Sequence, residues 1–223
     1  MRLYLASTSP ARLATLRAAG IEPILLPSYV DEEIAAEIAG PQSGEDLVMM
    51  LAQLKAEAVA GRLVDGEPID GFILGGDSAF ELDGQIFGKP HTEQVARERW
   101  LDQRGRDGVL HSGHWIIDHR AGVAGDGIGR VSSATVSFAE NITDEEIDAY
   151  IATGEPLEVA GAFTIDGMGA AFISKVEGDP HTVVGLSLAL VRELLLQFDV
   201  SCRRCGTATC RHSTVIKTPF WRC

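Results

Sequence analysis

The sequence predicts an α/β fold, because strand signals and helix signals alternate along the chain. Short apolar runs such as residues 72–76 are typical of buried strands, and residues 43–60 show the apolar period of an amphipathic helix. The chain has 223 residues and 45% hydrophobic content, enough to fill a sizeable core in one large domain or two lobes.

The N-terminal elements follow from their boundaries. Residues 2–6 are expected to form a buried strand that runs into Ser9 and Pro10. A helix over about 10–19 should stop at Gly20, since glycine is preferred just past a helix end. Residues 21–26 form a second predicted strand, and the proline at position 23 places it at an edge or a bend.

The clearest predicted helix covers residues 43–60. Ser43 with Asp46 three residues later resembles a capping box, and Gly61 ends the helix. Lys55 is expected beside the apolar stripe, where it can point along the surface into a cleft. The stripe is predicted to consist of Leu47, Met50, Leu51, Leu54 and Ala58.

Residues 72–76 predict a buried strand from whose carboxyl end Asp77 emerges, the edge where ligands bind in α/β sheets. Residues 79–87 predict a hairpin around the turn Asp83-Gly84, which returns Lys89 to the neighbourhood of Asp77. Sequence spacing alone also allows non-catalytic roles for Asp77 and for the lysines. An aspartate at a strand end is most often a turn or cap residue, and a lysine beside a helix stripe is usually solvated.

The second half of the chain predicts two long strands at 109–118 and 130–139, flanking a glycine-rich loop. A helix capped by Thr143 and Glu146 follows, and residues 187–198 form the last amphipathic helix. His111 and His114 lie three apart in a strand, so they should point to opposite faces and not form a metal pair. We expect one in the core and one facing water.

The charge excludes some partners. The formal net charge is −13, and residues 201–223 hold five cations and no acid, which leaves 14 Lys and Arg against 32 acids, a net of −18, in residues 1–200. Such a body repels a polyanion, so duplex nucleic acid is not an expected partner. Apolar runs are too short for a membrane span, and no signal-peptide pattern is present. The expected compartment is the cytoplasm.

All four cysteines lie in the same basic tail, at positions 202, 205, 210 and 223. The C-x2-C-x4-C spacing permits a zinc site with Cys223 or His212 as the fourth ligand, but structural zinc sites usually offer paired ligands at both ends. We therefore interpret residues 201–223 as a flexible, unstructured extension of a domain that covers residues 1–200. The absence of cysteine from that domain suits a reducing compartment.

Two common phosphate and hydrolase motifs are excluded. The run from Gly84 to Pro90 resembles a phosphate-binding loop, but it is one residue short and proline replaces the required serine or threonine. The sequence has no G-x-S-x-G elbow, which disfavours a serine hydrolase.

Six segments in this order resemble the Maf family of nucleoside triphosphate pyrophosphatases over about residues 3–198. They are LASTSPAR (5–12), VDE (30–32), LAQLKAEAV (51–59), ILGGDS (73–78), FGKP (87–90) and GEPLEVAGAFTIDG (154–167). The resemblance implies an α/β fold with a mixed sheet and flanking helices, two lobes around a long nucleotide-binding cleft, and a homodimer. It also implies hydrolysis of a nucleoside triphosphate to the monophosphate and pyrophosphate.

The resemblance implies roles for individual residues. Asp77 corresponds to the proton acceptor, and Glu32 and Asp77 would hold a divalent cation, Mg²⁺ or Mn²⁺, because carboxylate and phosphate oxygens suit these ions. The positions matching the nucleotide cleft are Ser7, Arg12, Glu32, Lys55, Ser78 and Lys89.

The sequence departs from the family pattern at two positions. Ala11 stands where the family often has the first of two arginines, so one phosphate contact is missing. Asp166 stands where many members carry glutamine at the base end of the cleft, and the preferred nucleobase stays open. The alternatives are a nucleotide-binding regulator of septum formation without significant turnover, and a metal-bound basic tail that docks on a partner or nucleic acid.

Overall fold

The computed structural model describes residues 2–200, so the predictions for residues 201–223 lie outside the described part. Its strands are β1 (Leu3–Leu5), β2 (Ile24–Leu25), β3 (Leu63–Val64), β4 (Glu67–Pro68), β5 (Gly71–Leu82), β6 (Gln85–Phe87), β7 (Asp107–His119), β8 (Gly127–Phe138) and β9 (Ile173–Glu177). Its α-helices are α1 (Pro10–Ala18), α2 (Glu32–Ala39), α3 (Gly44–Ala60), α4 (Glu93–Gln103), α5 (Asp144–Ile151), α6 (Pro180–Val184) and α7 (Leu188–Gln197). Short 3₁₀ turns span Arg120–Gly122, Glu155–Glu158, Ala160–Ala162 and Met168–Phe172.

The fold is a seven-stranded mixed sheet with helices packed against it, which confirms the predicted class. The strand order is β2-β1-β5-β7-β8-β9, and β6 pairs with β5. β1 is parallel to β2 and to β5, whereas the pairs formed by β5, β6, β7, β8 and β9 are antiparallel. The two-residue β2, next to Pro23, lies at the edge of the sheet as predicted.

β1 and β6 share one edge of β5 and leave a gap between them. β1 pairs with residues 72–74 of β5 and β6 pairs with residues 80–82, while β7 covers the other edge from 71 to 81. Within the described residues, positions 75–79 therefore have no strand beside them on the β1 side. The gap lies near the middle of β5, whose other edge is continuously paired with β7.

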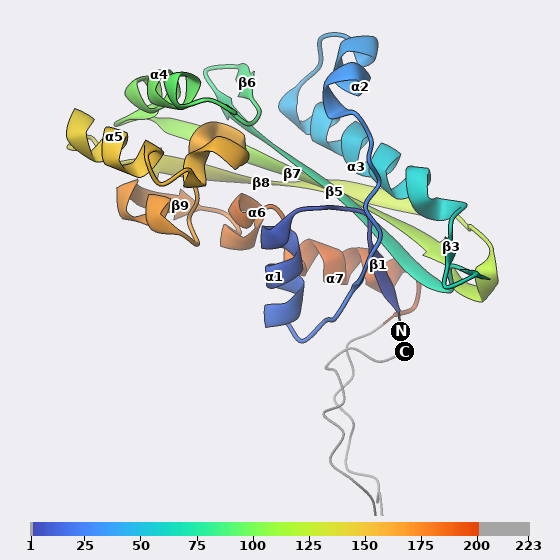
Figure 1. Ribbon diagram of the computed structural model, residues 1–223. Coiled ribbons are helices and arrows are strands. Elements are labelled where there is room, and N and C mark those ends of the chain that lie inside the picture. The colour runs from blue at the N-terminus through green and yellow to red at the C-terminus, as the bar shows by residue number, and fades with distance from the viewer. Residues whose placement is uncertain (1, 201–223) are drawn as a thin grey trace, which may run out of the picture.

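Helices divide into two groups along the long strands. Figure 1 shows α2 and α3 above and α1 and α7 below one half of the sheet, with α4, α5 and β6 grouped around the other half. The core around β1, α1 and α7 is aliphatic, with Leu5, Leu16 and Leu186 fully buried. The core under α4 and α5 is aromatic, where Trp100 and Phe138 meet edge to face at 5.6 Å between ring centroids. These cores hold the two halves of β5 on either side of the gap.

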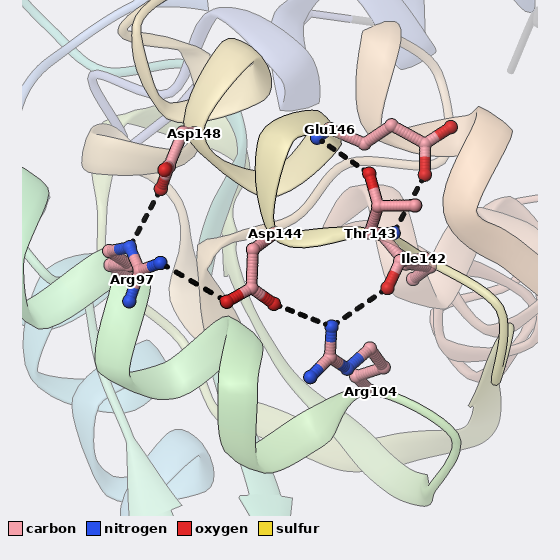
Figure 2. Close-up of polar contacts among 7 residues, drawn as sticks. All are labelled: Arg97, Arg104, Ile142, Thr143, Asp144, Glu146 and Asp148. Carbon is pink, nitrogen blue, oxygen red and sulfur yellow. Dashed lines mark hydrogen bonds and ion pairs between the residues drawn. The ribbon is translucent and has the colours of Figure 1, made fainter.

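The α4–α5 group is also joined at its surface (Figure 2). Arg97 of α4 contacts Asp148 at 2.7 Å, and Arg104 contacts both Asp144 and the Ile142 carbonyl, at 2.9 and 2.8 Å. The predicted capping box of α5 is present between Thr143 and Glu146. Because the ion pairs are largely exposed, each contributes little to the free energy of unfolding.

The structure corrects the predicted face of α3. The buried residues are Gly44, Val48, Leu51, Ala52, Lys55, Ala56 and Val59. Of the predicted stripe only Leu51 is buried, and Lys55 lies on the buried face instead of beside it. The inward face includes the small residues Gly44, Ala52 and Ala56, and α3 packs directly on two glycines of the sheet. A β-carbon on Gly75 would lie 2.0 Å from the Ala52 carbonyl oxygen, and one on Gly113 would lie 2.2 Å from the Val48 carbonyl oxygen.

Two further predictions differ from the structure. β5 does not end before Asp77 but continues to Leu82, so Asp77 lies mid-strand opposite Gly113 of β7. The hairpin is confirmed, with positive φ at Asp83 and Gly84 in its turn. His111 and His114 point to opposite faces as predicted, but both are buried, at 7% and 0% exposed. The expectation that one faces water was wrong, because helices cover both faces of β7.

Among the described residues, no helix has the length and apolar character needed to cross a membrane.

Candidate active site

A buried ion-pair triad stands at the gap in the β5 edge. Lys55 of α3 reaches down to Asp77 of β5, with 2.6 Å between Nζ and Oδ1, and Lys55 Nζ is also 2.6 Å from Oε1 of Glu32. Lys55 is 5% exposed and Asp77 is 6% exposed. Glu32 begins α2, and its side chain is 48% exposed. The sequence thus brings together three of its predicted site residues from three separate elements.

The two carboxyl groups of the triad differ in their electrostatics. Burial raises the pKa of Asp77 above its ordinary value, and the nearby charges of Lys55 and Arg12 offset only part of this effect. Burial also opposes the ionisation of Glu32, but the cations Lys55, Lys89 and Arg12 outweigh it and hold the pKa of Glu32 below its ordinary value. The triad therefore pairs one readily ionised carboxylate with one whose affinity for a proton is increased, a combination suited to acid–base chemistry.

Arg12 forms the second part of the site. Its Nη1 donates to Ser7 Oγ at 3.1 Å, its Nη2 donates to Ser78 Oγ at 2.9 Å, and its Nε donates to the Gly185 carbonyl at 2.9 Å. Burial lowers the pKa of Arg12 from its usual value, although Asp77 and Glu32 act in the opposite direction. The guanidinium is fixed by these bonds near the N-terminus of α1, where backbone N–H groups favour anions.

The support behind Arg12 includes residues that the sequence did not single out. Ser78 Oγ is 2.8 Å from Ser112 Oγ, and Ser112 donates to the Thr182 carbonyl at 2.8 Å. Gly185 closes α6 with a φ of 107°, which aims its carbonyl at Arg12. Ser112 is 0% exposed, and its place between His111 and Gly113 in a predicted strand was the only available signal. Gly185 had no signal, because it lies 173 residues from Arg12.

Comparison with known proteins places this geometry in context. The family model described as Maf-like protein matches residues 2–198. The chain belongs to the Maf family. A protein of Leifsonia xyli subsp. xyli called nucleoside triphosphate pyrophosphatase is 64% identical over 90% of this chain and 94% of its own length. A protein of the same name from Salinispora tropica is 52% identical over 90% of this chain and 85% of its own length.

A solved structure is similar at lower identity. The Ham1 protein of Staphylococcus aureus is 14% identical, with a TM-score of 0.41 over 89% of this chain and 97% of that chain. This likeness carries no argument about the site. The membership in the Maf family rests on the match along the sequence.

Two predicted site residues of this Maf chain lie away from the buried triad. Lys89 follows β6 and is exposed, and its charge acts on Glu32 without a direct contact. Asp166 is exposed, and no described contact joins it to Lys55, Asp77 or Arg12. The loop that carries Asp166 is tied down by Glu155, which accepts hydrogen bonds from Thr164 Oγ1 at 2.5 Å and from the backbone of Met168 and Gly169 at 3.1 Å each.

A hollow of about 450 Å³ lies elsewhere in the Maf chain, and it does not compete with the triad as a candidate site. Its polar lining side chains, Arg62 and His119, already contact backbone carbonyl groups of the protein. Arg62 donates to the carbonyls of Pro27 and Ser28, and both ring nitrogens of His119 contact backbone carbonyls at 2.8 Å. The chemistry-bearing groups gather at the β5 gap, and we assign the candidate active site there.

Proposed function

We propose that this Maf-family protein hydrolyses nucleoside triphosphates to the monophosphate and pyrophosphate at the gap in the β5 edge. The name of its relatives, nucleoside triphosphate pyrophosphatase, supports this activity. The observation that carries the proposal is the buried pair of Lys55 and Asp77 at 2.6 Å, beside the fixed guanidinium of Arg12. A triphosphate needs this combination of cations for its oxygens and a carboxylate for the attacking water.

Each residue has a separate task in the proposal. Asp77 orients the attacking water and accepts its proton, a task for which its raised pKa suits it. Arg12 and Lys55 neutralise charge on the non-attacking phosphate oxygens, and Lys89 does so from the opposite side of the gap. Ser7 and Ser78 hold the guanidinium of Arg12 in place through their hydroxyl oxygens. Because these bonds exist before substrate binds, the phosphate site needs little reorganisation.

The residues present fit a divalent cation of the Mg²⁺ type. Asp77 and Glu32 both reach the ammonium of Lys55 at 2.6 Å, so their carboxylates converge on one cationic position. Mg²⁺ is usually held by one or two carboxylates together with substrate phosphates, and these two carboxylates meet that requirement. When bound, the ion would polarise the phosphate and lower the pKa of a coordinated water. The divalent cation, the homodimer and the cytoplasmic location stay predictions.

The test of the function is pyrophosphate release from a panel of nucleoside triphosphates with Mg²⁺ or Mn²⁺. Asp77→Asn keeps the shape of the side chain and removes the base, so kcat should fall by about 10²-fold or more. Glu32→Gln removes a carboxylate of the triad and should also reduce turnover. The matched control is Glu37→Gln, on an exposed position of the same helix α2.

The outcome decides between catalysis and binding alone. If wild-type protein releases no pyrophosphate from any nucleotide, the proposal fails in favour of a binding role. If Asp77→Asn turns over at the wild-type rate, the assigned base is wrong even though the activity stands.

A further inference from the structure

A second polar cluster lies on the same face of β5 as Asp77, outside the residues used above. It consists of Glu81 of β5, His111 of β7, Ser133 of β8 and Glu45 of α3. His111 Nδ1 is 2.8 Å from Ser133 Oγ, and Ser133 Oγ donates to Glu45 Oε1 at 3.1 Å. His111 Nε2 faces Glu81 Oε2 at 3.4 Å. The N-terminus of α3 closes over the cluster, since a β-carbon on Gly44 would lie 2.8 Å from His111 Cδ2.

The hydrogen bonds of this cluster leave two acceptors facing each other. Because Ser133 uses its proton on Glu45, its oxygen accepts from Nδ1–H of His111. In the neutral ring, Nε2 is then an acceptor, and within the described residues it has no hydrogen-bond partner although His111 is only 7% exposed. The neighbouring carboxylate of Glu81 also accepts only. Buried polar atoms are normally paired, so this pair of acceptors is one donor short.

The position of the pair relative to Asp77 suits the far end of a nucleotide. Asp77 and Glu81 are four residues apart on one strand, so both side chains point to the same face and their α-carbons are about 13 Å apart at ~3.3 Å per residue. This spacing is comparable to the length of an extended nucleoside 5′-phosphate. Only Ala79, a small residue, lies between them on that face. Glu81 remains reachable, because a third of its side chain (33%) is exposed.

We propose that Glu81, held beside the acceptor Nε2 of His111, determines specificity at the nucleoside end of the substrate by accepting hydrogen bonds from N–H or O–H donors of the base or ribose. The proposal rests on the placement of the reacting phosphate at Asp77. A nucleoside whose donors meet the exposed carboxylate of Glu81 supplies it with hydrogen bonds. A nucleoside that presents carbonyl oxygens there leaves the carboxylate unpaired and is rejected.

The decisive variant is Glu81→Gln. The new amide can donate to His111 Nε2 from within the protein, and it replaces the carboxylate that accepts from the ligand. We expect kcat/KM for the best nucleoside triphosphate to fall by about 10- to 100-fold. The kcat/KM values of poor substrates should change by much less, so the difference between good and poor substrates becomes smaller. The matched control is Glu45→Gln, which keeps an oxygen for Ser133 on a side chain that is 61% exposed and should leave the ranking unchanged.

Calorimetric binding of nucleoside monophosphates separates this proposal from the proposed function, because it requires no turnover. A change in the order of affinities between wild type and Glu81→Gln supports the acceptor pair even if no triphosphate is hydrolysed. Comparison of ribonucleotides and 2′-deoxyribonucleotides locates the donor on the ligand. If Glu81→Gln loses affinity only for ribonucleotides, the donor is the 2′-hydroxyl. If it loses affinity equally for both, the donor is on the base or is the 3′-hydroxyl. An unchanged order of affinities, or a uniform loss for all nucleotides, overturns the proposal.

Discussion

Gly75→Ala tests whether the close approach of α3 to the sheet sets the position of Lys55. The added β-carbon would lie 2.0 Å from the Ala52 carbonyl oxygen and 3.0 Å from the Ala56 β-carbon. Opening the first contact to about 3.3 Å, a short ordinary C···O separation, requires α3 to move away by about 1.3 Å. Lys55 lies between these two alanines, so the same movement draws its ammonium away from Asp77.

The expected loss has two parts. Overpacking a tight contact costs about 1–3 kcal/mol, which lowers Tm by roughly 2–4 °C for each kcal/mol in a domain of this size. Misplacement of a catalytic group by about 1 Å can reduce the rate by about 10²-fold. Pyrophosphate release should therefore fall by this order at 20 °C, a temperature where the variant remains folded by circular dichroism.

The control is Gly61→Ala, at the C-terminal end of the same helix. A β-carbon there meets no atom within 4 Å, and the residue has an ordinary negative φ of −90°. Its activity and Tm should match those of wild type. If Gly75→Ala loses stability but keeps its full rate, the contact supports packing alone and the inference about Lys55 is refuted.

Three further predictions concern pH, helix capping and base choice. Burial lowers the pKa of His114 from 6.5 to about 4, so the neutral ring contributes up to about 3 kcal/mol of stability that is present above pH 6.5 and lost as pH falls towards 4. His114→Gln keeps an acceptor for the Ser187 N–H and should show a weaker loss in urea unfolding between pH 7 and 4.5. Thr143→Ala removes the α5 cap and should cost about 1 kcal/mol without changing turnover. Asp166→Gln replaces an acceptor by a group that also donates and should change the ranking of nucleoside triphosphates.

Each of these predictions has an outcome that contradicts it. Equal pH dependence of wild type and His114→Gln would show that another group controls acid unfolding. A lower rate in Thr143→Ala would mean that α5 couples to the site. An unchanged ranking in Asp166→Gln would limit that residue to a turn or surface role.

Local signals in the sequence were sufficient for most element boundaries. Ser43, Thr143 and Ser187 begin their helices as predicted, because capping depends on residues within one turn. The Asp83-Gly84 turn is also local and is confirmed. Resemblance to the Maf family then named Lys55, Asp77 and Arg12. Their long-range contacts join Lys55 to Asp77, 22 residues apart, and Arg12 to Gly185, 173 residues apart.

The predictions failed where packing against a distant element determines which face of a helix is buried or where a strand ends. The apolar stripe of α3 was predicted on Leu47, Met50, Leu51, Leu54 and Ala58. In the structure the helix is rotated so that Val48, Ala52 and Ala56 lie against Gly75 and Gly113 of the sheet. β5 was predicted to stop at its glycines, but the ladder with β7 carries it on to Glu81 and the pairing with β6 extends it to Leu82. The acceptor pair at Glu81 had no sequence signal, since it forms only when β5, β7 and β8 align.

The gap in the β5 edge also bears on how the protein avoids association with other chains. Unpaired strand edges offer backbone N–H and C=O groups to foreign strands, and such edges promote aggregation. Phe72 N–H and Leu74 C=O bond towards β1, so by the two-residue period the backbone groups of Gly76 and Ser78 point into the gap. β1 and β6 close this opening at both ends, which limits the open edge to residues 75–79. The fold can thus present free peptide groups to a small ligand while it keeps the edge open to another polypeptide short.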